Sequence, residues 1–145
     1  GKKSKLMQQI LFGKQNEAFE TCDSTGFEWL SRDKELVAKY VLDDQCGFVL
    51  TIDSLSKMFE GMRLSQRRDM LMHIPSSLSI NIIAGEDDPI HRKGVGILAM
   101  IQKYKEVGIK EMHLESYPGA RHELLNETNK NQVIANLVNW METKR

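Results

Sequence analysis

The 145-residue sequence has few cysteines, no net charge and no long apolar run, and each shortage excludes a class of protein. Its two cysteines, Cys22 and Cys46, lack CxxC spacing, which argues against a disulfide framework or a zinc site and favours a reducing, cytoplasmic setting. Its 20 basic residues balance 20 acidic ones, so no overall field attracts nucleic acid or an anionic membrane. We therefore expect partners to be selected by local sites.

Signals for membrane insertion and secretion are also missing. The longest apolar runs, such as residues 80–84, fall far short of the roughly 18 residues that a transmembrane helix needs. The basic residues 1–5 are followed by Gln8 and Gln9 rather than by an apolar stretch with a cleavage site. With 41% hydrophobic residues, the chain is expected to form a globular unit with its own core and neither a transmembrane segment nor a signal peptide.

Helical and irregular patterns dominate the sequence before Pro75. Residues 2–11 and residues 65–73 are expected to form short helices, and residues 12–29 are expected to form a loop. No repeat or low-complexity tract interrupts this part of the chain. The change of pattern at Pro75 predicts a boundary there.

Two further helices are expected within this first part. Ser31 or Asp33 can cap a helix whose apolar residues recur on one face. A second helix should begin near Asp53 or Ser54 and be interrupted around Gly61, because glycine is a poor helix former.

After Pro75 the pattern alternates between strand and helix. Residues 78–84 are nearly all apolar, as expected for a strand covered on both faces, and residues 112–117 form a second short strand. A helix is predicted between them over residues 94–107. The last helix should begin at Asn129, with Gln132 completing a capping box. The order βαβα predicts an α/β fold with parallel strands.

Titratable residues gather in the two loops that follow these strands. In open α/β sheets, working residues lie beyond the carboxyl ends of the strands. The first loop offers Glu86, Asp87, Asp88 and His91, and the second offers Arg121, His122 and Glu123. If the strands are neighbours, an aspartate on one loop can accept the Nδ1 proton of a histidine on the other. On spacing alone, the same pattern fits ordinary exposed loop residues.

Three strings carry a resemblance to a known family. The stretch INIIAGEDDPI, followed by MHLESYPGARHELLNE and then VIANLVNWM, resembles the end of serine hydrolases in the lysophospholipase, monoacylglycerol-lipase and serine-aminopeptidase group of the α/β-hydrolase superfamily. Upstream, FEWLSRD and CGFVLT resemble that group's cap insertion. The resemblance implies a helical cap segment over residues 1–75. It implies that residues 76–145 are the C-terminal βαβα part of an α/β-hydrolase core.

The resemblance also assigns two catalytic residues. In this family the acid lies in a G-x-x-D-P-like turn and the histidine in a G-x-x-H turn, which places them at Asp88 and His122. Asp87 competes for the acid role, although the position before Pro89 favours Asp88. Asp87 would then serve only to satisfy backbone donors of the loop.

The nucleophile of the family is not found in the sequence. The superfamily order is nucleophile, acid, histidine, and the nucleophile requires a G-x-S-x-G elbow that the chain lacks. The nearest string, from Cys22 to Gly26, has one glycine and no preceding strand. The resemblance therefore implies that the chain begins just after the sixth strand of the fold, as a truncation or a separately made half, and is inactive alone.

The function implied by the resemblance is hydrolysis of a carboxylic ester by a Ser-Asp-His mechanism, with no cofactor or metal. Lysophospholipids or monoacylglycerols are the implied substrates, because the cap of the family encloses one acyl chain. Peptides are the alternative, as in the aminopeptidase relatives. A non-catalytic alternative is an interaction module or complementing subunit that associates through the edge of the strand at residues 78–84, as a homodimer, a domain swap or a complex with the missing half.

The remaining candidates have structural explanations. His91 is expected to be solvated at the start of a helix, and His73 and His113 to be surface or satisfied core residues. The HELLN string at His122 is not a zincin motif, because Asn126 replaces the second histidine. Methionines and aromatic residues form either an acyl pocket or simply the core of the cap. The aromatic residues are Phe12, Phe19, Phe27, Trp29, Phe48 and Phe59.

Overall fold

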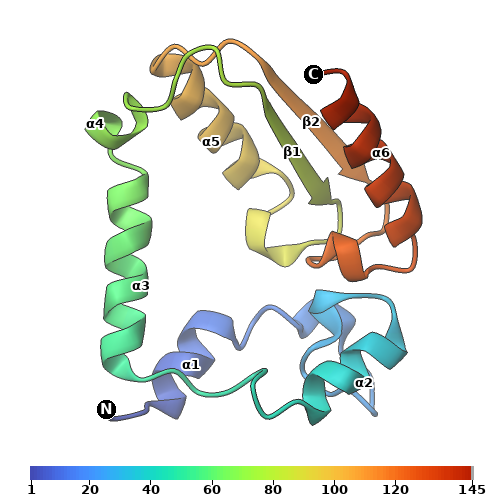
Figure 1. Cartoon of the computed structure of the whole chain (residues 1–145). Helices are drawn as coiled ribbons and strands as arrows, with labels where there is room; N and C mark the ends of the chain where they lie inside the picture. Colours follow the sequence, from blue (N-terminus) through green and yellow to red (C-terminus); the bar gives the residue numbers. More distant parts are fainter. Residues whose placement is uncertain (145) are drawn as a thin grey trace.

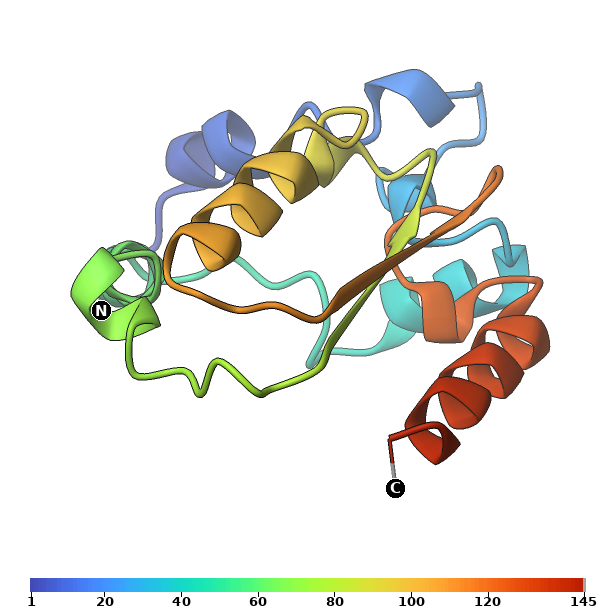
Figure 2. The same ribbon diagram turned by 90° about the horizontal axis from the view of Figure 1, so that it is seen from above.

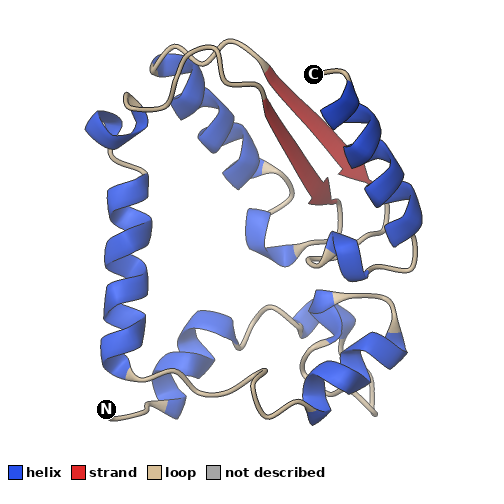
Figure 3. Ribbon diagram, in the orientation of Figure 1, coloured by secondary structure: helices blue, strands red, loops and turns tan. Residues whose placement is uncertain are grey.

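Two parallel strands organise the second half of the chain, in a computed structural model that describes residues 1–144 (Figures 1 and 3). Strand β1, Ile80–Gly85, pairs in register with β2, Met112–Tyr117. Helix α5, Val95–Glu106, connects them, and α6, Lys130–Glu142, follows β2. The predicted βαβα order with parallel strands is confirmed. Gly108 adopts a φ of +94° just after α5, a backbone conformation that favours glycine.

The two helices lie on opposite faces of this small sheet (Figures 1 and 2). Successive strand residues point to alternate faces, so Ile83 faces α6 whereas Ala84 faces α5. The core lies on the α6 face. It consists of Tyr117, Ala120, Leu124 and Val133, with Ile83 and Leu137 packed against them.

The cover of the sheet is incomplete among the described residues. A strand covered on both faces was predicted, but residues 80–83 of β1 are only half-buried and no residue of α5 is buried. Two apolar residues of α5, Val95 and Leu98, are 61% and 63% exposed. The apolar run correctly predicted a strand, but burial depends on neighbours that a run of residues does not specify.

The first part of the chain forms four α-helices among its described residues, and they border the sheet on two sides (Figure 1). Helices α1, Lys5–Phe12, and α2, Lys34–Leu42, lie beyond the carboxyl ends of the strands. Helices α3, Ile52–Ser65, and α4, Arg68–Leu71, run back along the side towards β1. The assignment of residues 1–75 as a cap stays a prediction.

Two of the four helices test the predicted caps. Asp33, not Ser31, caps α2: its Oδ1 accepts the backbone N–H groups of Glu35 and Leu36 at 3.1 and 3.2 Å. The cap of α3 is Thr51, whose hydroxyl accepts the N–H of Ser54 at 3.1 Å, so this helix begins before either predicted residue.

The predicted interruption at Gly61 is wrong. Helix α3 runs without a break through this residue, since one glycine costs only about 1 kcal/mol relative to alanine. The predicted capping box of α6 is also wrong. Asn129 stands at the N-cap, but its Oδ1 accepts the Nη2 group of Arg32 at 2.9 Å rather than a helix N–H. Arg32, which is distant in sequence, therefore bonds the Asn129 side chain in place of the helix N–H groups.

None of the helices formed by residues 1–144 is long and apolar enough to cross a membrane.

The substitution Gly61→Ala should stabilise the chain. A Cβ at this position meets no atom within 4 Å, and alanine restricts the unfolded chain more than glycine does. We expect urea denaturation followed by circular dichroism to give an increase of about 0.5–1 kcal/mol in the free energy of unfolding. A decrease would mean that α3 needs the flexibility of glycine.

Candidate active site

The loops that follow β1 and β2 meet at one end of the sheet. The parallel register brings both carboxyl ends together, and the N–H of Asp87 donates to the carbonyl of Ala120 at 3.0 Å. Gly85 makes this approach possible, since a Cβ there would overlap the carbonyl oxygens of Ala120 and Arg121. Backbone contacts therefore hold the two loops against each other.

Asp88 and His122 form a side-chain hydrogen bond between these loops. The Nδ1 atom of His122 lies 2.9 Å from Oδ2 of Asp88. An ionised carboxylate can only accept, so Nδ1 carries the proton. The other oxygen, Oδ1, accepts the N–H of Ile90 at 2.8 Å, which caps the 3-10 turn η3, Pro89–His91. Each oxygen of Asp88 has its own partner, and the carboxylate is fixed in orientation.

The hydrogen bond shifts the pKa of both groups. Burial opposes ionisation of Asp88, but hydrogen bonds from His122 and from the N–H of Ile90 outweigh it and lower the pKa of this carboxyl. The hydrogen bond to Asp88 raises the pKa of His122 above its ordinary value, against a smaller opposing effect of burial. The site therefore stabilises an imidazolium beside a carboxylate, as proton transfer to Nε2 requires.

A segment from the first part of the chain covers the other side of His122. The Trp29 ring packs against the imidazole, with centroids 4.9 Å apart and planes at 42°. The carbonyl of Trp29 accepts the N–H of His122 at 3.3 Å, and the carbonyl of Leu30 accepts the N–H of Glu123 at 2.8 Å. Among residues 1–144, Nε2 of His122 has no hydrogen-bond partner. This nitrogen is available to a reacting group.

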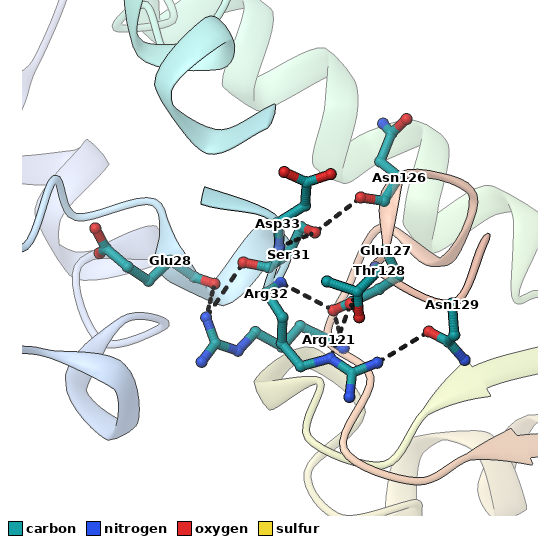
Figure 4. A network of polar contacts seen from close by, with 9 residues as sticks. All are labelled: Glu28, Ser31, Arg32, Asp33, Arg121, Asn126, Glu127, Thr128 and Asn129. Atoms are coloured by element: carbon teal, nitrogen blue, oxygen red, sulfur yellow. Dashed lines mark hydrogen bonds and ion pairs between the residues drawn. The ribbon is translucent and has the colours of Figure 1, made fainter. Parts of the chain in front are cut away.

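A buried acidic residue, Glu127, joins the two segments beside His122 (Figure 4). Its Oε1 accepts the N–H groups of Arg121 and Arg32 at 2.8 and 3.1 Å. Its Oε2 accepts Nε of Arg32 at 2.9 Å and the N–H of Thr128 at 3.0 Å. Nothing in the local sequence marks Glu127, because its cationic partner lies 95 residues away.

Other predicted loop residues have structural roles. Arg121 points away from His122: its Nη1 donates to the carbonyls of Glu28 and Ser31 at 2.7 and 3.2 Å, and its guanidinium lies 4.1 Å from the centroid of the Phe19 ring. Glu123 accepts the side-chain amide of Asn126 at 2.8 Å.

The remaining acids of the first loop are exposed. The side chains of Glu86 and Asp87 form no hydrogen bond or ion pair with residues 1–144, and the structure brings Asp88 rather than Asp87 to the histidine.

The prediction for His91 is wrong. Its imidazole is half-buried, with Nε2 2.6 Å from the carbonyl of Gly85 and Nδ1 2.8 Å from the N–H of Gly94. The ring ties the start of α5 to the end of β1. His73 bonds the carbonyl of Asp69 through Nδ1 at 2.8 Å, and His113 is exposed on β2.

Ser24, in the string nearest to a nucleophile elbow, is engaged elsewhere. Its hydroxyl donates to Oε2 of Glu28 at 2.7 Å within an irregular loop. Glu28 also accepts the N–H and hydroxyl of Thr25 at 2.6 and 2.8 Å. Burial opposes the ionisation of Glu28, but these hydrogen bonds hold its pKa well below the usual range. The loop is organised around a carboxylate and presents no activated serine.

An aromatic pocket of about 430 Å³ lies beside Trp29. It falls within the size range of small-molecule sites. Four of the six predicted aromatic residues line it, namely Phe12, Phe27, Trp29 and Phe48. Phe19 lies under Arg121 and Phe59 is 41% exposed, so these two take no part.

Comparisons with known proteins identify a matching family and similar folds. The serine aminopeptidase S33 family matches residues 3–129. A highly thermostable carboxyl esterase from Bacillus coagulans, crystallised with glycerol, is similar with a TM-score of 0.83 and 25% identity, over 98% of this chain and 46% of that one. A lipase in an open form has a TM-score of 0.81 at 22% identity, over 99% of this chain and 46% of its own, a likeness of fold alone. No curated protein matches.

Both structures confirm the predicted fold, part of an α/β-hydrolase. The chain spans about half the length of either one.

The substitution Asp88→Asn should reduce stability in a pH-dependent way. Asparagine keeps the cap to Ile90 but removes the charge beside His122. The raised pKa of His122 contributes stability below its ordinary value of 6.5, and this contribution is lost as the pH rises through the folded-state pKa. The lowered pKa of Asp88 contributes above its ordinary value of 3.8 and is lost as the pH falls through the folded-state pKa.

We therefore expect the loss of unfolding free energy to be largest between pH 3.8 and 6.5 and smaller in alkaline solution. Urea denaturation in both ranges measures it. Asp87→Asn, in the same loop but exposed, is the matched control and should show no such difference. An equal loss at all pH values would contradict an ion pair.

Proposed function

The chain belongs to the serine aminopeptidase S33 family, and we propose that it supplies the acid and the histidine of a serine ester hydrolase. The acid is Asp88 and the histidine is His122. The hydrogen bond of 2.9 Å between them is the observation that carries the proposal. The nucleophilic serine lies outside the 145 residues, because the sequence contains no G-x-S-x-G elbow.

The proposed reaction is acyl transfer. The serine oxygen attacks the ester carbonyl carbon while Nε2 of His122 accepts the serine proton. Asp88 holds Nδ1 protonated and stabilises the imidazolium that forms. The proton then passes from Nε2 to the departing alcohol as the C–O bond breaks. Water repeats the sequence on the acyl-enzyme and releases the acid.

The proposed substrate is a monoacylglycerol or a lysophospholipid. The aromatic pocket supports an apolar acyl chain, since Trp29 lines it and also packs against His122. The similar structures, a carboxyl esterase and a lipase, support an ester. Membership of a serine aminopeptidase family supports a peptide as the alternative. Parallel assays with a monoacylglycerol, a lysophospholipid and an aminoacyl peptide separate these substrates.

A fluorophosphonate probe tests the proposed division of the triad. We expect no serine of the 145-residue chain to be labelled. In a protein that also carries the G-x-S-x-G elbow, that serine should be labelled, and Asp88→Asn should lower kcat by about 10⁴, as loss of the triad acid does in serine proteases. Asp87→Asn should keep the activity. Labelling of a serine within the chain itself would contradict the proposal.

A complementing subunit is the second candidate function. The outer edge of β1 has no strand beside it among residues 1–144, and a two-stranded sheet is a poor structure by itself. Exposed apolar residues also lie on both covering helices, including Leu98 of α5 and Met141 of α6, which are 63% and 60% exposed. An unpaired strand edge near apolar surface favours the addition of a strand from another chain.

Light scattering over a dilution series tests this association. We expect the isolated chain to form dimers or larger species that dissociate on dilution, because β1 then gains a neighbouring strand. A monomer at every concentration would count against the complementing subunit. It would leave the catalytic proposal untouched, because that proposal concerns Asp88 and His122.

A further inference from the structure

Glu127 is a fully buried acidic residue beside the proposed site. Its side chain is 0% exposed, yet it is a carboxylate. Burial alone would raise its pKa, but hydrogen bonds from the N–H of Arg121, from the Arg32 side chain and from other backbone N–H groups hold the pKa below its ordinary value. Glu127 is therefore charged at neutral pH and needs every one of these donors.

The donors come from the two segments that surround His122. The N–H of Arg121 belongs to the residue immediately before His122 and lies 2.8 Å from Oε1. Arg32 lies three residues after Trp29, whose carbonyl accepts the N–H of His122. The N–H of Arg32 lies 3.1 Å from the same oxygen of Glu127. Oε1 of Glu127 thus bonds both backbone segments that flank the imidazole of His122.

Arg32 completes the arrangement from outside the core. Its guanidinium donates Nε to Glu127 at 2.9 Å and Nη2 to Asn129 at 2.9 Å, while its side chain keeps 32% of its surface exposed. Ser31 adds a hydroxyl bond to the carbonyl of Asn126 at 2.8 Å. Figure 4 shows these residues converging on Glu127 from two separate segments.

We propose that Glu127, paired with Arg32, is a positioning residue for His122, an inference that rests on the proposed function. The buried carboxylate fixes the turn that carries the histidine and the segment that carries Trp29, and so holds Nδ1 within reach of Asp88. Glu127 touches neither the imidazole nor the substrate, so its action passes through the backbone of Arg121 and Arg32.

Two substitutions separate positioning from a simple effect of charge. Glu127→Gln removes a negative charge and puts an amide N–H₂ group among N–H donors. Arg32→Met removes a positive charge and the side-chain donor. If Glu127 and Arg32 acted on His122 only through their charges, Glu127→Gln would lower the pKa of His122 and Arg32→Met would raise it. If the pair positions His122, both substitutions loosen the contact with Asp88 and both lower the pKa.

The experiment is an NMR titration of the His122 ring proton in the full chain. We expect the pKa to fall towards its ordinary value of 6.5 in both variants. The charged and titratable groups around the contact are Asp88, Glu123 and His91, and all three stay unchanged. Shifts of opposite sign, or an unchanged pKa in folded variants, would overturn the proposal.

Two controls remove the effect of general destabilisation. Glu115→Gln replaces a half-buried carboxylate that accepts the amide of Asn136 on the α6 face, away from the loop of His122. Leu55→Ala removes a buried side chain of α3. Both should leave the His122 titration unchanged.

If either test variant fails to fold, Arg32→Lys takes its place. Its single ammonium keeps the charge but loses the fork that spans Glu127 and Asn129, so the pKa should still fall.

A kinetic measurement tests the proposal in the protein that carries the nucleophile. Glu127→Gln should lower kcat by up to about 100-fold with little change in KM, because a displaced histidine affects the chemical step. A rise in KM alone would overturn the positioning role. If no ester is hydrolysed at all, the proposed function fails, while the NMR titration still decides whether Glu127 positions His122.

Discussion

The structure around His122 depends on one constraint, the burial of a carboxylate that must remain charged. A carboxylate without water is stable only when hydrogen bonds replace its hydration, and Glu127 obtains them from Arg32, Arg121 and Thr128. Meeting this requirement forces residues about 90 positions apart in sequence into one network. The turn that carries His122 and the segment that carries Trp29 cannot separate without exposing the Glu127 carboxylate or removing its hydrogen-bond donors.

The two candidate catalytic groups are therefore held by different means. Asp88 is placed by the sheet: Gly85 allows the loops to touch, and the cap to Ile90 fixes one carboxylate oxygen. His122 is placed by polar contacts with the first part of the chain. Strand geometry brings the loops to the same edge, and the imidazole is oriented between Asp88 on one side and the Trp29 segment on the other. A site built in this way needs both parts of the polypeptide.

The incomplete cover of the sheet agrees with the comparisons. A parallel strand normally has neighbours on both sides and helices on both faces. Here β1 has one neighbour among the described residues, and α5 and α6 expose apolar side chains. The similar esterase and lipase structures are about twice as long as the region they share with this chain. Both observations are consistent with a fold that is continued by further strands.

The sequence by itself determined the βαβα order and the parallel strands, because these follow from apolar periodicity and from backbone preferences within short segments. It also singled out Asp88 and His122, through turn motifs that resemble those of a family. The roles of Asn129, His91 and Glu127 were decided by tertiary structure. Each side chain bonds a partner that packing supplies, and for Asn129 and Glu127 that partner is Arg32, more than 90 residues away. Local sequence patterns carry no information on such a partner, because the donors near a side chain in the folded protein come from residues that are distant in sequence.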